Sequence, residues 1–313
     1  MAAMLAVDPV REGGGGDWER DAALGALLLG RSVETTPALA GDDAVTRFLA
    51  PGTRVFVPWL PDAVAEETIA AARALRERGM VPVPHLAARR IPDAGALDRL
   101  LRRLRSEAAV AVAEVLVVGG DVAAPVGPFE SALQLLETGL LGAHGIAGVG
   151  VGGYPEGHHR AAERELLEAL LRKQAWAARA GHDMFVVTQF AFRAAPVVDW
   201  LGRVRASGLR LPIHVGVPGP ARIGTLVRYA RMCGIGPSWK LLLRHGKGLA
   251  GAARVADCGR MVLDLAAHAS AHPEAGLAPL HIYPFGGLRR AADWIGGLVA
   301  MAGNGARPDS GAD

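Results

Sequence analysis

The sequence predicts an α/β protein that folds as a single (β/α)8 TIM barrel, and three observations lead to this prediction. Eight short apolar runs alternate with longer amphipathic stretches. Most runs begin roughly 25–35 residues after the previous one, the length of one strand–helix unit. The runs are apolar at nearly every position, as in parallel strands buried on both faces. They are RSVET from Arg31, RVFVPW from Arg54, VPVPHL from Val81, EVLVVGG from Glu114, IAGVGVGGY from Ile146, MFVVTQF from Met184, LPIHVGV from Leu211 and PLHIY from Pro279.

The stretches between the runs have helical periodicity, for example AVAEETIAAARALRERG over 63–79 and AAERELLEALLRKQAWAARAG over 161–181. The longer interval before the last run predicts two or three helices. A doubly wound open sheet is the alternative fold. It is disfavoured because no strand leads through a GxGxxG turn into a helix and no GxxxxGK[ST] motif occurs.

The length of 313 residues suits one large domain. We place a flexible tail that contains the run Gly13–Gly16 at residues 1–22, the catalytic barrel at 23–303 and a second flexible tail at 304–313. The net charge is only +3, and basic residues alternate with acidic ones along the helices. This pattern indicates solvated helix faces and argues against nucleic-acid binding.

Cysteine usage and hydropathy favour a cytoplasmic location. Cys233 and Cys258 lie far apart and form no CxxC motif, so neither a disulfide framework nor a zinc site is expected. No apolar run approaches the roughly 18 residues that span a bilayer. The first residues lack the basic and apolar regions of a signal peptide. We expect no membrane partner, and the sequence leaves a homo-oligomer open.

Polar residues follow six of the predicted strands. The carboxyl ends of the strands meet at one face of a barrel, and active sites are built there. The sequence therefore predicts a functional site at this face. The residues are Glu34, His85, Asp121 after Gly119 and Gly120, the group Tyr154, Glu156 and His158, the pair Thr188 and Gln189, and Tyr283.

Each of these residues has a functional and a structural interpretation. A carboxyl at a barrel mouth, such as Glu34, can have a raised pKa and act as a general acid, or it can be a helix cap. The Gln189 amide can pair with the edge of a planar heterocycle or make an internal hydrogen bond. The glycines before Asp121 allow close approach to a ligand or form an ordinary turn. His85 follows a proline and is either a ligand donor or structural.

Two adjacent histidines and two adjacent arginines could bind a metal ion or an anion. His158 and His159 are adjacent and point in different directions, and no HxH or HxxxH pattern accompanies them, so we expect no metal site. Arg289 and Arg290 begin the last predicted helix. They either meet an anionic ligand tail or are solvated.

Six motifs together resemble the methylenetetrahydrofolate reductase family along nearly the whole chain. They are SVETTP, PVPHLAAR, VLVVGGDVAAP, VGGYPEGHHRA, VVTQFAF and LHIYPFG, in the family's order and spacing. YPEGH and TQFAF are the most specific. The resemblance implies a (β/α)8 barrel of one-carbon metabolism. Typical members bind FAD and pass hydride from NADH or NADPH to methylenetetrahydrofolate, giving methyltetrahydrofolate for methionine biosynthesis.

The resemblance also implies roles for individual residues. Glu34 matches the general acid that opens the imidazolidine ring of the folate, Asp121 matches the aspartate between flavin and pterin, and Gln189 matches a pterin ligand. The further substrate-side positions are Tyr229, Thr225 and Arg289. The flavin-contacting positions are His85, Gly120, Asp121, Tyr154 and His158.

Some positions depart from the family pattern, and most of them concern the flavin. Pro58 or Trp59 stands where the family usually has a threonine, and Gly119 replaces an arginine. The aspartate and lysine that hold the ribityl-phosphate region have no clear counterparts in the helix after YPEGH. We therefore predict weak or altered FAD binding, with hydride passing between NAD(P)H and the folate either through FAD or directly. The alternatives are a reductase of another pterin and a non-catalytic folate- or flavin-binding subunit. The physiological direction, synthetic or demethylating, stays open.

Overall fold

The computed structural model describes residues 17–60, 64–106, 112–232, 255–256 and 258–303. Residues 1–16, residues 304–313 and Cys233 lie outside the described residues. The boundary that we expected after residue 22 falls within helix α1 (Asp17–Leu28). Leu24, Leu27 and Leu28 of this helix are buried, and the helix begins directly after the glycine run, before the boundary that we expected.

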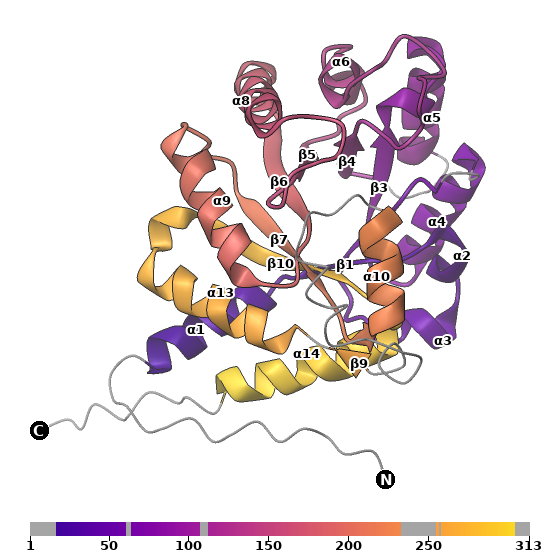
Figure 1. The fold of residues 1–313 in the computed structure, drawn as a ribbon. Helices are drawn as coiled ribbons and strands as arrows, with labels where there is room; N and C mark the ends of the chain where they lie inside the picture. The colour runs from indigo at the N-terminus through magenta and orange to yellow at the C-terminus, as the bar shows by residue number, and fades with distance from the viewer. Residues whose placement is uncertain (1–16, 61–63, 107–111, 233–254, 257, 304–313) are drawn as a thin grey trace, which may run out of the picture.

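Eight parallel strands form a closed barrel, which confirms the predicted fold class (Figure 1). Each predicted apolar run overlaps one strand, and β1 pairs with β10 through Val33 and Ile282 to close the barrel. The strands are β1 (Ser32–Glu34), β2 (Arg54–Val57), β3 (Val81–Ala87), β4 (Glu114–Val118), β5 (Gly148–Gly153), β6 (Asp183–Phe190), β7 (Ile213–Pro218) and β10 (Leu277–Tyr283).

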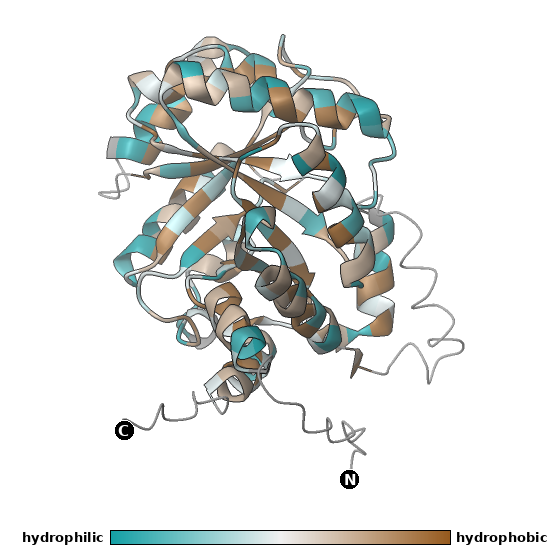
Figure 2. Cartoon of the chain, turned by 90° about the vertical axis from the view of Figure 1, so that its left-hand side faces the viewer, coloured by the Kyte–Doolittle hydropathy of each residue, from teal (hydrophilic) through white to brown (hydrophobic). Residues whose placement is uncertain are grey.

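Helices surround the barrel, and the apolar residues run along the strands inside this ring (Figures 1 and 2). The stretches 63–79 and 161–181 contain α4 and α8, as predicted. After α1, the described α-helices are α2 (Pro37–Ala40), α3 (Asp43–Thr46), α4 (Ala65–Glu77), α5 (Ala94–Ser106), α6 (Ala132–Leu136), α7 (Leu140–Ala143), α8 (Glu163–Ala180), α9 (Ala194–Ala206), α10 (Ile223–Met232), α13 (Gly259–Ala271) and α14 (Leu288–Gly303).

The interval before β10 contains features that the sequence pattern did not predict. β8 (Ala221–Arg222) and β9 (Val255–Ala256) pair as a small antiparallel sheet. Two-residue strands are too short to show any hydrophobic period, so pattern analysis cannot find them. The described part of this interval contains the helices α10 and α13, and residues 233–254 lie outside the description.

Strand residues alternate between two apolar layers. Val55, Val57 and similar residues pack outward against the helices, whereas Phe56, Val83, Leu116, Phe185 and Val187 fill the barrel interior. Glycines in β5 make room for this filling. A Cβ on Gly150 would lie 2.7 Å from Phe185 Cε2. The glycine-rich run VGVGG therefore serves interior packing.

A polar group closes the barrel beneath the aromatic layer, at the amino ends of the strands. Arg54 begins β2 and forms a 2.6 Å ion pair with Glu114, which begins β4. The guanidinium carbon of Arg54 lies 4.6 Å from the ring centroid of Phe185. His214 accepts from Arg54 at 3.5 Å through Nε2, because its Nδ1 donates to the Pro279 carbonyl at 2.6 Å. Arg54, Glu114 and His214 thus form a charged but paired group at the amino end of the barrel, which we call the barrel floor.

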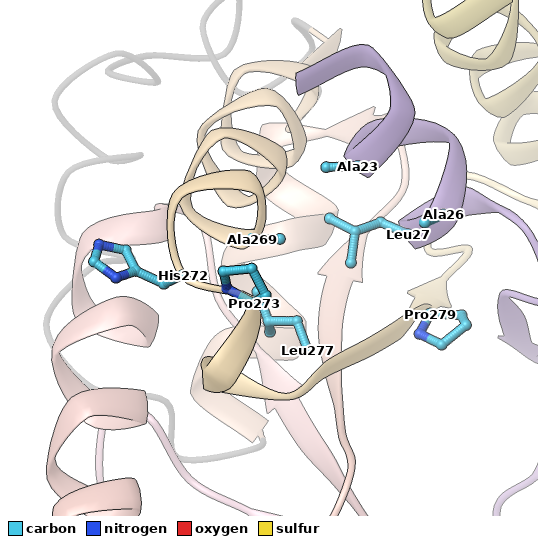
Figure 3. Close-up of a pocket in the computed structure, with 8 residues that line it drawn as sticks. All are labelled: Ala23, Ala26, Leu27, Ala269, His272, Pro273, Leu277 and Pro279. Atoms are coloured by element: carbon cyan, nitrogen blue, oxygen red, sulfur yellow. The ribbon is translucent and has the colours of Figure 1, made fainter. Parts of the chain in front are cut away.

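A hollow of about 320 Å³ lies beside the first half of β10, between α1 and α13 (Figure 3). Leu27, Ala269 and Leu277 are among its apolar lining residues, and His272 lies at its edge. None of the described helices combines the length and apolar character needed to cross a membrane.

Candidate functional site

A cavity of about 480 Å³ opens at the carboxyl ends of the strands, the face at which the sequence predicted a site. Its lining comes from the segments after β1 and β2, from the end of β6, from α10 and from the segment after β10. Glu34, Gln189 and Tyr229 all line it. Residues nearly two hundred positions apart in the sequence are thereby brought to one cavity by closure of the barrel.

One wall of the cavity is aromatic. Tyr229 stacks on Phe285 with ring centroids 4.4 Å apart, and Phe190 meets Phe285 at 4.7 Å. The Tyr283 hydroxyl donates to the Thr188 carbonyl at 3.0 Å, which fixes its ring beside them. Such a wall can stack against a flat ligand. Phe190 and Phe285 were not among the residues predicted for the site, although Phe190 lies in the motif TQFAF and Phe285 in YPFG, both at strand ends.

Glu34 ends β1 and faces two imidazoles. Its Oε2 atom lies 3.7 Å from His85 Nε2 and 3.9 Å from His281 Nε2. Burial raises the pKa of the Glu34 carboxyl, and the nearby His85 opposes this only in part. The side chain retains 22% exposure and lines the cavity. A neutral carboxyl that reaches a ligand cavity can act as a general acid.

The two histidines beside Glu34 are themselves neutral at neutral pH. Burial lowers the pKa of His85 to about 4. Burial, assisted by the charge of Arg54, lowers the pKa of His281 to about 3. Neutral imidazoles do not stabilise the ionised carboxylate as nearby cations would, so they do not lower the pKa of Glu34 in that way. His281 was not among the residues predicted for the site. The sequence feature that could have indicated it is a histidine inside the apolar run PLHIY.

The predicted flavin-side residues lie at the β3, β4 and β5 exits and are not among the lining residues of this cavity. Asp121 is exposed and forms a 2.8 Å ion pair with Arg90. Gly120 has a φ of 102°, which favours glycine, and a Cβ there would lie 3.4 Å from Ala87. Tyr154 is packed edge to face against His158, with centroids 4.8 Å apart.

The remaining predicted substrate residues, Thr225 and Arg289, are not among the lining residues of the cavity. Thr225 is half-buried on α10, one helical turn before Tyr229. Arg289 is exposed at the start of α14, next to the lining residue Leu288, with its guanidinium carbon 6.0 Å from the Phe48 ring centroid. In the part of the chain that the structure describes, no group of three or more His, Cys, Asp or Glu residues could hold a metal ion.

α8 follows the YPEGH motif, and the resemblance places the aspartate and the lysine that hold the ribityl-phosphate region of FAD in this helix. A helix amino terminus is an ordinary phosphate site, but this first turn carries Glu163 and Glu165. Glu165 Oε2 already accepts the Ala162 N–H at 2.9 Å. Arg160 donates to the carbonyls of Asp121 and Val122 at 2.8 and 3.1 Å, which ties the β4 and β5 exits together. The first turn of α8 thus presents two carboxylates, and Arg160 beside it is engaged by backbone carbonyls.

Fold and site together define a (β/α)8 barrel protein with an acid and an aromatic wall at its carboxyl face. The model of the family described as methylenetetrahydrofolate reductase matches residues 45–240. The chain therefore belongs to the methylenetetrahydrofolate reductase family. Glu34 and β10 lie outside the matched range, so their assignment rests on the geometry given above.

Two solved structures are similar to the chain. One is an uncharacterized protein from Clostridium thermocellum that binds two copies of 5-methyl-5,6,7,8-tetrahydrofolic acid. It has 10% identity and a TM-score of 0.56, and the match covers 91% of this chain and 98% of that one. The other is a dihydropteroate synthase from Thermus thermophilus, with 16% identity, a TM-score of 0.40 and coverage of 86% and 93%. The first similarity supports the barrel fold.

The buried neutral histidines predict a loss of stability in acid. His214 has a pKa lowered to about 4, mainly by burial, from an ordinary value of 6.5. Because the folded-state pKa is below the unfolded one, the unfolded chain binds the extra proton as the pH falls from about 6.5 towards about 4. The stability present above this window is lost within it, by on the order of 2 kcal/mol per histidine between pH 7 and pH 5. Urea unfolding at both pH values measures this loss.

The variant His214→Gln should unfold with a smaller difference between the two pH values than the wild type. The variant His159→Gln changes an exposed histidine and serves as the control. The raised pKa of Glu34 acts in the opposite direction, because its contribution falls as the pH rises, but it is common to all three proteins. An unchanged pH dependence in His214→Gln would contradict a neutral buried histidine.

Proposed function

We propose that the protein transfers hydride between NAD(P)H and methylenetetrahydrofolate, with methyltetrahydrofolate as the reduced product. The observation that carries the proposal is the buried acid Glu34 in one cavity with Gln189 and the aromatic wall. Family membership supports the reaction class. The folate bound by the similar Clostridium thermocellum protein supports the substrate class.

The cavity residues suit the steps of this reaction. The aromatic wall offers a stacking surface for the pterin, and Gln189 offers a donor and an acceptor to its edge. Glu34 protonates N10 of the folate, the bond between N10 and the bridging carbon breaks, and an N5 iminium forms. Hydride from the nicotinamide then adds to that carbon and gives the N5-methyl group and NAD(P)⁺. Glu34 regains its proton from solvent, so one proton is consumed in each turnover.

We propose that hydride passes directly from the nicotinamide to the folate. The departures from the family's flavin pattern at Pro58 or Trp59 and at Gly119 support this proposal, and Arg160 is engaged by the carbonyls of Asp121 and Val122. Direct transfer needs only that two flat rings be held at close range, which is a matter of positioning. The nicotinamide is then a second substrate at the barrel mouth.

Two alternatives keep the fold and the folate-like ligand. A reductase of another pterin would use the same Gln189 and Glu34. A non-catalytic folate-binding subunit is in keeping with the bound folate of the similar structure. The raised pKa of Glu34 favours an enzyme, because a binding protein does not need a proton donor at its ligand.

Replacement of Glu34 by glutamine is expected to abolish most turnover. The amide is nearly isosteric but cannot donate the proton, and general-acid catalysis contributes typically 10²–10⁴-fold. Turnover is measured as NAD(P)H oxidation with methylenetetrahydrofolate, and methyltetrahydrofolate binding by calorimetry should persist. The control Glu66→Gln changes an exposed glutamate on α4. Full activity in Glu34→Gln would remove the acid assignment. A wild type inactive in both directions, with and without FAD, would leave the binding subunit.

The visible spectrum of the purified protein tests direct transfer. We expect no flavin absorbance and no increase in NAD(P)H-dependent turnover when FAD is added, because Pro58 or Trp59 and Gly119 depart from the family's flavin-contacting pattern. Heat-released supernatant, scanned for flavin fluorescence, provides the same measurement after unfolding. A yellow protein with stoichiometric flavin would rule out the flavin-free form of the proposal.

A further inference from the structure

Two buried imidazole nitrogens inside the barrel face the same carboxyl oxygen. Nε2 of His85 and Nε2 of His281 have no hydrogen-bond partner among the described residues. They lie 3.7 and 3.9 Å from Oε2 of Glu34. His281 is on β10, which pairs with β1, and His85 is on β3, two strands from β1 on the other side. The His281 side chain is 1% exposed. A buried polar atom without a partner costs free energy, so the arrangement calls for a hydrogen bond that these distances nearly provide.

The other ring nitrogen of His281 indicates which group donates. Nδ1 lies 2.9 Å from the Ser32 hydroxyl oxygen, within hydrogen-bond distance. If Nδ1–H donates to Ser32, Nε2 is an acceptor. A neutral Glu34 carboxyl carries an O–H that needs an acceptor. One assignment therefore satisfies both groups: Nδ1–H to Ser32 and the Glu34 O–H to Nε2.

The surroundings of His281 keep its ring in place. Phe56 and Tyr283 contact it edge to face, each with centroids 4.6 Å away. The ionisable groups around it come from four strands: Glu34 on β1, Arg54 on β2, His85 on β3 and His214 on β7. Arg54 is the charged member and disfavours a proton on His281. The imidazole is thus held neutral and fixed in orientation.

We propose that His281 is a positioning residue whose Nε2 accepts a hydrogen bond from the Glu34 O–H, which keeps the carboxyl neutral and aims it at the cavity, with Ser32 fixing the imidazole tautomer. The purpose of this hydrogen bond rests on the proposed function, because the proton held here is the one delivered to N10 of the folate. The hydrogen bond itself belongs to the ligand-free protein. It shortens by rotation of the Glu34 carboxyl towards Nε2, and substrate N10 then replaces His281 as the acceptor.

The test is a ¹³C NMR titration of the ligand-free protein labelled at the glutamate carboxyl carbon. The Glu34 resonance is assigned by its loss in Glu34→Gln. In the wild type its midpoint should lie above the ordinary value of 4.5. In His281→Gln it should fall by about one pH unit, a tenfold change, because the amide offers an N–H donor to the carboxylate. The control His214→Gln changes another buried histidine and should leave the midpoint in place.

Turnover provides a second readout. In His281→Gln, kcat should fall about tenfold with little change in the KM for folate, and the pH profile of kcat should move with the NMR midpoint. An unchanged midpoint in a folded His281→Gln protein would overturn the proposal, and so would equal shifts in His281→Gln and His214→Gln. Because the NMR titration needs no substrate, an inactive wild type would affect only the proposed function.

The wild type alone provides a test that does not depend on folding of a variant. Long-range ¹H–¹⁵N correlation spectra distinguish the two imidazole tautomers. We expect the proton of His281 on Nδ1, and we expect Ser32→Ala to introduce a population with the proton on Nε2. Observation of the Nε2–H tautomer in the wild type would overturn the proposal, because Nε2 could not then accept the proton of Glu34.

Discussion

The partial burial of Glu34 beside two neutral imidazoles is the constraint on which the rest of the site depends. A carboxyl in water is ionised at neutral pH and is a poor proton donor, and burial at the end of β1 raises the pKa of the Glu34 carboxyl. The neighbours preserve the effect because His85 and His281 are neutral. The nearest interior charge, Arg54, is paired with Glu114 on the barrel floor. The neighbouring polar groups therefore leave the raised pKa of Glu34 at the barrel mouth largely intact.

Catalytic and structural demands meet on the same strands. β2 provides Arg54 for the floor and Phe56 for the packing around His281, and β10 provides His281 for Glu34 and Tyr283 for the aromatic wall. The half of the mouth formed by β4 and β5 is built differently, with arginines bonded to carbonyls and to Asp121. This asymmetry agrees with a substrate cavity on one side and a modified flavin region on the other.

The sequence predicted the barrel because buried parallel strands impose a continuous apolar signal that recurs at a fixed interval. It also predicted Glu34, Gln189 and Tyr229, which do share one cavity. It could not predict His281, because an isolated histidine in an apolar strand reads as core until closure against β1 places it beside Glu34. The paired state of Asp121 likewise depends on Arg90, whose approach is a tertiary contact.

The most direct test of the account is a single turnover with methylenetetrahydrofolate and NAD(P)H deuterated at both C4 positions, without added flavin. Mass spectrometry of the methyl product follows the label. Direct transfer at the Glu34 cavity predicts that the new methyl group carries the nicotinamide deuterium without loss to solvent. A flavin intermediate would pass the hydride through N5, where it exchanges with water. Product that forms only when FAD is present, or that lacks the deuterium, would contradict the account.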